Sequence, residues 1–262
     1  MDPRNYQTLK EEVLPRMGFG GVFDDQLQPA MQQGKPEFSL QVPASFGTDK
    51  MNYELVFQKN KKDTNDQRYY LNEVKVVLEK PEAPKKEYTF QLFNQTGFNA
   101  SQMYNAMDGR YVHSEFRGKS NNQVSVWTTI QETQKEGKIV TSDRRVYENS
   151  SNFNLVKAMS ALPLAAMSQE QKENALQNMR DGHKASVIIK TDTGRESVTL
   201  VAQPHVGEIA VFNLKGERLH LDKANVQGVA PVFELPPLTK SLVEAADKKD
   251  KTQEQKQGTK VR

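Results

Sequence analysis

The stretch Gln102-Met103-Tyr104-Asn105-Ala106-Met107-Asp108-Gly109-Arg110 contains the pattern on which the predicted fold rests. Ala106 and Met107 follow Met103 by three and four residues, which places all three on one face of a short helix. Gly109 follows, and glycine is the residue best suited to the left-handed conformation that closes a helix. The stretch therefore predicts a helix that packs one apolar face and ends at this glycine.

Two other stretches, residues 26–35 and 175–184, have the same arrangement of apolar residues ahead of a glycine. Alternating β-branched and aromatic residues follow all three glycines, a pattern typical of antiparallel hairpins. We interpret the chain as an α+β fold of tandem, internally repeated modules, in each of which a helix or helix pair lies on an antiparallel sheet. The residues assigned to the repeated positions are Leu27, Met31, Gly34, Met103, Met107, Gly109, Met179 and Gly182.

The first and third copies share a further segment. Leu14-Pro15 and Leu162-Pro163 each place their proline 19 residues before the glycine of their own copy. Apolar spacing ahead of both pairs predicts an earlier helix that ends where proline disfavours continuation. Asp24 or Asp25 is expected to cap the helix that follows in the first copy. These shared positions indicate a duplication.

The same patterns divide the chain of 262 residues into regions. Residues 1–150 are predicted to form an N-terminal α+β region with two helix–hairpin units, 4–80 and 81–150. The second unit begins with a strand at 88–93. Residues 151–222 are predicted to form a C-terminal unit with two helices and a β-meander. Whether these units form two domains or one continuous sheet is left open.

The net charge of the chain comes from its end. The chain has 36 basic and 33 acidic residues, a formal net charge of +3, and residues 247–262 hold six basic and three acidic residues. This segment is predicted to be a disordered basic tail. Residues 223–246 are expected to run over the surface with a short helix. The neutral remainder gives no positive evidence for a face that follows nucleic-acid phosphates.

Composition excludes several classes of protein. Cysteine is absent, so disulfide frameworks, thiolate zinc sites and cysteine nucleophiles are excluded. No run approaches the roughly 18 to 20 apolar residues of a membrane span, and the N-terminus lacks the apolar stretch of a secretory signal. We expect a soluble, cytoplasmic protein without membrane contact.

Four short segments also stand out: Met17-Gly18-Phe19-Gly20, Gly34-Lys35-Pro36-Glu37-Phe38, Tyr70-Leu71-Asn72, and the stretch from Tyr104 through Gly109-Arg110. They resemble motifs in a group of uncharacterised Bacteroidetes proteins, some of which are associated with conjugative or other mobile elements. The likeness covers about residues 6–222. It implies a bacterial, intracellular setting. The group has no assigned activity, so the resemblance implies no catalytic residues.

No catalytic constellation is visible in the sequence. His113, His183, His205 and His220 lack the spacing of metal ligands on one helix face, and they are interpreted as surface or capping residues. Asp192-Thr193-Gly194 occurs once, whereas the aspartic-protease dyad needs two such carboxylates, so it is interpreted as a hairpin turn. We therefore predict no catalytic, cofactor-binding or metal-binding residues and no enzymatic activity.

The leading hypothesis is a non-enzymatic interaction protein that offers sheet faces or clefts between modules to a protein partner. One alternative is an accessory protein of a mobile element that binds nucleic acid weakly through residues 247–262. The other is a small-molecule-binding or hydrolytic domain, in which carboxylates from distant segments converge on a pocket.

Overall fold

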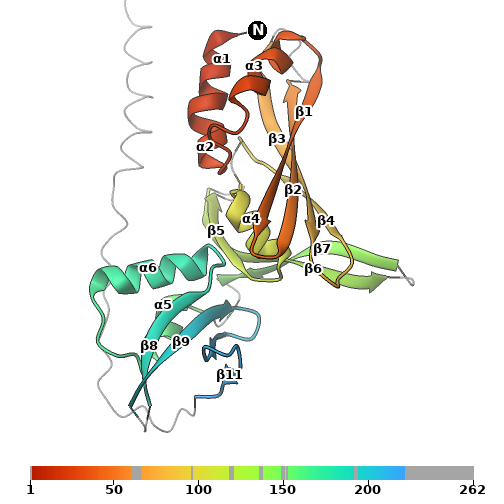
Figure 1. Ribbon diagram of the computed structural model, residues 1–262. Coiled ribbons are helices and arrows are strands. Elements are labelled where there is room, and N and C mark those ends of the chain that lie inside the picture. The colour runs from red at the N-terminus through yellow and green to blue at the C-terminus, as the bar shows by residue number, and fades with distance from the viewer. Residues whose placement is uncertain are drawn as a thin grey trace, which may run out of the picture. The chain divides into compact units, whose positions relative to one another are not determined.

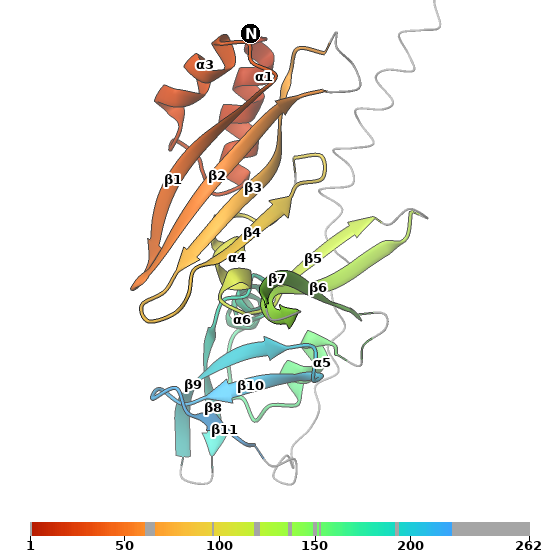
Figure 2. The same ribbon diagram turned by 90° about the vertical axis from the view of Figure 1, so that its right-hand side faces the viewer.

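The computed structural model describes residues 2–60, 66–95, 97–117, 121–135, 138–148, 151, 153–191 and 194–221 (Figures 1 and 2). These residues contain helices and three separate antiparallel sheets, which confirms the α+β class and excludes one continuous sheet among them. They fall within one unit, Met1–Val226. The predicted surface segment 223–246 and tail 247–262 lie outside the described residues.

The first sheet is covered on one face by the N-terminal helices (Figure 1). Its order is β1-β2-β3-β4, and its strands are β1 (Glu37–Phe46), β2 (Asp49–Lys59), β3 (Tyr69–Glu79) and β4 (Lys86–Gln91). The helices are α1 (Pro3–Thr8), the π-helix η1 (Leu9–Val13), α2 (Leu14–Arg16) and α3 (Asp24–Gln32). Leu9, Leu27 and Met31 from the helices are buried with Tyr53 and Leu71 from the sheet. Alternation along the strands and helical spacing thus supply the two faces of one core.

Pro15 does not end the first helix, contrary to the prediction. The helix continues through Arg16, and Pro15 lies inside α2. The π turn ahead of it gives the reason, since the Leu14 N–H donates to the carbonyl of Leu9, five residues earlier. A proline ring normally clashes with the carbonyl four residues before it, and the wider turn relieves that clash.

The second sheet has the order β5-β6-β7 and follows α4 (Ala100–Met107). Its strands are β5 (Val112–Arg117), β6 (Gln123–Lys135) and β7 (Lys138–Tyr147). The strand expected at 88–93 was assigned to this unit, but β4 pairs with β3 in the first sheet, with Val76 opposite Tyr88. Antiparallel neighbours joined by a short connection pair more readily than distant ones. The first sheet therefore extends beyond residue 80.

The third sheet has the order β11-β10-β9-β8. It is preceded by α5 (Leu155–Ser160) and α6 (Gln169–Arg180), and its strands are β8 (Ala185–Thr191), β9 (Gly194–Gln203), β10 (Glu208–Phe212) and β11 (Arg218–Leu219). As predicted, α5 ends ahead of Leu162-Pro163. The chain then covers the outer edge of β8, because the Ala165 N–H donates to Ile188 O at 2.8 Å and the Lys190 N–H to Pro163 O at 2.7 Å.

Strand β6 contributes to two apolar cores. Ile130 packs with Met103 and Met107 in the core of the first sheet. Trp127 is completely buried and packs with Phe153 and Met179 in the core of the third sheet. The second sheet therefore connects the two cores, because both faces of its central strand are covered.

The three glycines at the ends of α3, α4 and α6 share a backbone conformation. Gly34, Gly109 and Gly182 have φ values of +69°, +86° and +76°. Their surroundings differ: a Cβ at Gly34 or Gly109 would meet nothing within 4 Å, whereas one at Gly182 would lie 2.9 Å from Asn105 Cβ and from Val112 Cγ2. Shared local geometry alone does not establish duplication, so the internal repeat stays a prediction.

Candidate functional site

The apolar residues assigned to repeated positions lie in the two cores. Leu27, Met31, Met103, Met107 and Met179 are at most 1% exposed. With their helix-closing glycines they position the elements of the fold, and they leave no polar or reactive group at a surface. Their role is packing, and the candidate sites lie elsewhere.

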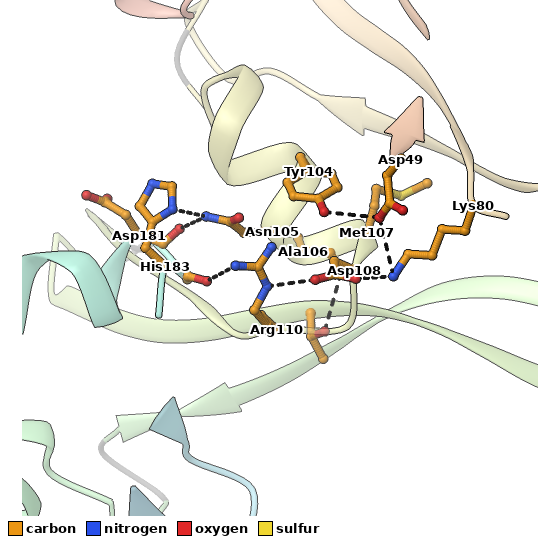
Figure 3. A network of polar contacts seen from close by, with 12 residues as sticks. Asp49, Lys80, Tyr104, Asn105, Ala106, Met107, Asp108, Arg110, Asp181 and His183 are labelled. Atoms are coloured by element: carbon orange, nitrogen blue, oxygen red, sulfur yellow. Dashed lines mark hydrogen bonds and ion pairs between the residues drawn. The ribbon is translucent and has the colours of Figure 1, made fainter. Parts of the chain in front are cut away.

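A polar network surrounds α4 and links segments that are far apart in the sequence (Figure 3). The helix is held at its start by a capping box, in which Asn99 Oδ1 accepts from the Gln102 N–H at 2.9 Å and the Asn99 N–H donates to Gln102 Oε1 at 3.0 Å. Gln102 also donates to Asp181 Oδ1 at 2.7 Å, in the turn after α6. Both ends of α4 contribute to this network.

The centre of the network holds two carboxylates and two cations. Lys80 forms ion pairs with Asp108 and with Asp49. Arg110 Nε lies 2.9 Å from Asp108 Oδ2, an ion pair without hydrogen-bond geometry. The side chains of Asp49, Asp108 and Arg110 are 14%, 20% and 15% exposed. Lys80 is 35% exposed, so the four charges are partly buried, and the set is neutral overall.

Tyr104 completes the centre as a hydrogen-bond donor. Its hydroxyl donates to Asp49 Oδ2 at 3.1 Å, and the Arg110 guanidinium lies 5.3 Å from the centre of its ring. Burial first, and then the carboxylates of Asp108 and Asp49, raise the pKa of Tyr104 to about 12. Tyr104 therefore stays protonated near neutral pH and cannot serve there as a base.

The network continues to the turn between α6 and β8. Arg110 donates to Gly182 O at 3.0 Å, and Asn105 Nδ2 donates to Asp181 O at 2.7 Å. Asn105 Nδ2 also lies 3.2 Å from His183 Nδ1. Each charged group in this network has a partner inside it, so we interpret it as a structural junction rather than a catalytic site.

A second polar cluster brings together a serine, a histidine and a glutamate. His113 Nε2 lies 2.6 Å from Ser125 Oγ and 3.5 Å from Glu148 Oε1, which also accepts from Trp127 Nε1 at 2.8 Å. Nucleophilic catalysis needs the carboxylate on one ring nitrogen and the hydroxyl on the other. Here both contact the same nitrogen, so His113 cannot relay a proton between them.

His113 is wrong as a predicted surface or capping residue, because its side chain is only 9% exposed. The other three histidines agree with that interpretation, since His183 follows the end of α6 and His205 and His220 are exposed. His183 contacts Ser101 and Asn105, His205 stacks on Tyr111 with ring centres 5.3 Å apart, and His220 is exposed. Within the described part of the chain, no group of three acidic or histidine side chains is placed to hold a metal ion. The strands flanking the Asp192-Thr193 dipeptide pair as a hairpin, with Thr191 opposite Gly194; the dipeptide itself lies outside the described residues.

The outer edge of β1 offers backbone groups to a ligand. Among the described strands, only β2 pairs with β1 (Figure 2). The Lys59 N–H donates to Pro36 O at 3.0 Å, so even-numbered positions direct their backbone groups toward β2. In an antiparallel ladder the intervening positions direct theirs away. Glu37, Ser39 and Gln41 therefore present N–H and C=O groups at the outer edge.

A groove of about 520 Å³ lies beside this edge, between β1 and α3. It is lined by Asp25, Gln26, Pro29, Ala30, Gln33, Lys35, Glu37, Phe38, Ser39 and Leu40. Leu27 and Met31 occupy the opposite, core-facing side of α3. The groove is open and combines two apolar side chains, Pro29 and Ala30, with polar and charged residues of α3 and β1.

The groove was not predicted from the sequence, and the predicted N-cap of α3, Asp24 or Asp25, was wrong. The N-cap is Phe23, which has no side-chain cap, and both aspartates lie in the first turn. Asp24 pairs with Lys10 at 3.2 Å, while Asp25 lines the groove. Pro43 inside β1 was an available signal of an edge strand, since proline in a sheet is confined to edges, strand starts and bulges.

The chain matches no family model, no curated protein and no solved structure. Among the described helices, none has the length and apolar character needed to cross a membrane. The fold and the groove therefore carry the functional argument.

Proposed function

We propose that the protein is a non-catalytic binding protein that holds an extended segment of a partner protein along the outer edge of β1. The observation that carries this proposal is the row of outward backbone groups at Glu37, Ser39 and Gln41, beside the groove under α3. A partner segment would add a strand to the first sheet, and its side chains would enter the groove. Strand addition is a common mode of peptide recognition.

Two features of the edge support binding over simple exposure. Phe38, Val42, Ala44 and Phe46 are partly buried apolar residues on the core face of β1. An added strand beside residues 37–41 would cover Phe38 further and extend the same core. Edge strands that are not used in binding are usually shortened, charged, interrupted by proline or covered. Residues 163–165 cover the edge of β8, whereas in β1 proline interrupts the edge only at Pro43, beyond the part that borders the groove.

The junction around α4 supports the proposal indirectly. Its ionic groups compensate one another, and the serine–histidine–glutamate cluster lacks the geometry of a relay. The described residues give no specific support for the hydrolytic alternative. Nucleic-acid binding through residues 247–262 stays a prediction, because that segment lies outside the described residues.

The proposal is tested with a display library of random nine-residue peptides, selected on the full chain. Selected peptides are then measured by fluorescence anisotropy against wild type and Ser39→Pro. This substitution removes an outward N–H without touching the β1–β2 ladder, since Pro43 already occupies an equivalent position. We expect at least a roughly tenfold loss of affinity, because one hydrogen bond is lost and the proline ring obstructs the added strand.

Ser45→Pro is the matched control. Ser45 is also an exposed, odd-numbered serine of β1, but it does not line the groove. Peptides should bind this variant as they bind wild type, and the thermal unfolding of both variants should agree. The proposal is wrong if the library yields no binding peptides, or if Ser39→Pro leaves the affinity of the selected peptides unchanged.

A further inference from the structure

This inference rests on the proposed function. We infer that the groove binds a partner segment of one sequence pattern and in one chain direction. The segment is a short β-strand of a partner protein, antiparallel to β1, with apolar side chains at alternate positions. It carries a basic residue at its amino end, facing Asp25, and an acidic residue at its carboxyl end, facing Lys35.

The backbone of β1 limits the length of the bound strand. Glu37, Ser39 and Gln41 each offer an outward N–H and C=O, but Pro43, the next outward position, has no N–H. Hydrogen bonding is therefore interrupted after Gln41. The template covers about five residues, the same part of β1 that borders the groove.

The two faces of β1 set the side-chain pattern of the segment. Phe38 and Leu40 lie on the face covered by the helices, where Phe38 stacks on Phe57 with ring centres 4.8 Å apart. Side chains of an added strand on this face would meet Pro29 and Ala30 in the groove. On the other face, Glu37 accepts a hydrogen bond from Gln58 at 2.7 Å and is exposed. Alternating apolar and polar residues match these surroundings.

The charges at the two ends of the groove set the direction. Asp25 lies in the first turn of α3, about 10 Å along the helix axis from its last residue, Gln32, and Lys35 lies in the turn that follows. Within the described part of the chain, neither side chain forms an ion pair. Because α3 is followed by a turn into β1, Lys35 lies at the start of the template and Asp25 toward Gln41. In an antiparallel segment, the amino end therefore lies beside Asp25 and the carboxyl end beside Lys35.

The test uses two capped nine-residue peptides with valine at alternate positions. One has arginine at position 3 and glutamate at position 7, four residues apart to match the five-residue template, and the other has these two residues exchanged. Binding to the full chain is measured by fluorescence anisotropy at low salt, where exposed charges are least screened. We expect the first peptide to bind about two- to fivefold more tightly, the range for exposed ion pairs.

Variants separate this inference from the proposed function. Asp25→Asn combined with Lys35→Gln should abolish the preference, while Asp24→Asn should preserve it, because Asp24 pairs with Lys10 and does not line the groove. If both peptides bind equally well and Ser39→Pro weakens both, the inferred direction of the segment is wrong, but the proposed strand addition remains supported. Absence of binding by these peptides and by any library peptide would overturn both.

Discussion

Asn5 and Tyr69 form two hydrogen bonds that join α1 to the start of β3. Asn5 Nδ2 donates to Tyr69 O at 3.0 Å, and the Tyr69 N–H donates to Asn5 Oδ1 at 2.9 Å. The side-chain amide thereby replaces a neighbouring strand at this point. Tyr69 also donates its hydroxyl to Lys35 O at 2.5 Å, beside the groove. Tyr69 therefore contacts both α1 and the segment that leads into β1.

Asn5→Ala should lower the free energy of unfolding by about 2 to 3 kcal/mol. Asn5 is 7% exposed, so the substitution leaves a buried donor and a buried acceptor without partners. Asn52→Ala, at an exposed position of β2, should change stability by less than about 0.5 kcal/mol. Urea unfolding followed by circular dichroism measures both, and equal effects would show that the pairing contributes little.

Gly182→Ala should destabilise the protein more than Gly34→Ala. Both residues have positive φ, which costs an L-residue about 1 to 2 kcal/mol. Only at Gly182 would the new methyl group approach Asn105 Cβ and Val112 Cγ2 to 2.9 Å, and such overpacking adds about 1 to 3 kcal/mol. Urea unfolding of the two variants gives the difference. Equal losses would show that the contact between α4 and the α6–β8 turn relaxes easily.

Local patterns predicted most of the elements and little of their assembly. The alternating residues after Gly109 and the helical spacing before it predicted β6 and α4, because both signals are contained within a few residues. The contacts of Arg110 with Gly182 and of Lys80 with Asp108 join segments 72 and 28 residues apart. Pairing over such separations depends on strand order, which periodicity does not encode.

The same limit explains the missed groove. Its residues come from α3 and from the outer side of β1, and their polar character is that of any exposed surface. Alternation in β1 indicated which side chains share one face of the strand. It did not indicate that one edge of the strand has no paired neighbour. The π turn before Pro15 was not predicted either. Its wider hydrogen-bonding pattern leaves room for the proline ring, so the helix continues where proline would normally end it.

Arg110→Lys should destabilise the protein by about 1 to 2 kcal/mol although it keeps the charge. The guanidinium contacts Gly182 O, Asp108 and the ring of Tyr104 together, and a compact ammonium cannot reach all three. Arg117→Lys, at an exposed position of β5, is the control and should be neutral within about 0.5 kcal/mol. Urea unfolding tests both. A neutral Arg110→Lys would show that charge alone suffices at the junction.

Stability should fall as the pH is lowered from 7 through the region below 6.5, in part because of His113. Burial is the main cause that lowers the pKa of His113 in the folded protein below its ordinary value of 6.5, outweighing the opposing influence of Glu148. The unfolded chain then binds a proton at a pH where the folded protein does not, so unfolding is favoured as pH falls. The loss stops growing once the pH is below the folded-state pKa.

His113→Gln should flatten this pH dependence, since glutamine does not titrate and can still bond Ser125. Part of the slope should remain, because burial also lowers the pKa of His205. His220→Gln, at an exposed position, is the matched control and should leave the profile of wild type unchanged. The measurement is the midpoint of urea unfolding at pH values between 7 and 5. An unchanged slope in His113→Gln would show that His113 is protonated in the folded protein as readily as in the unfolded chain, and that Glu148 compensates its burial.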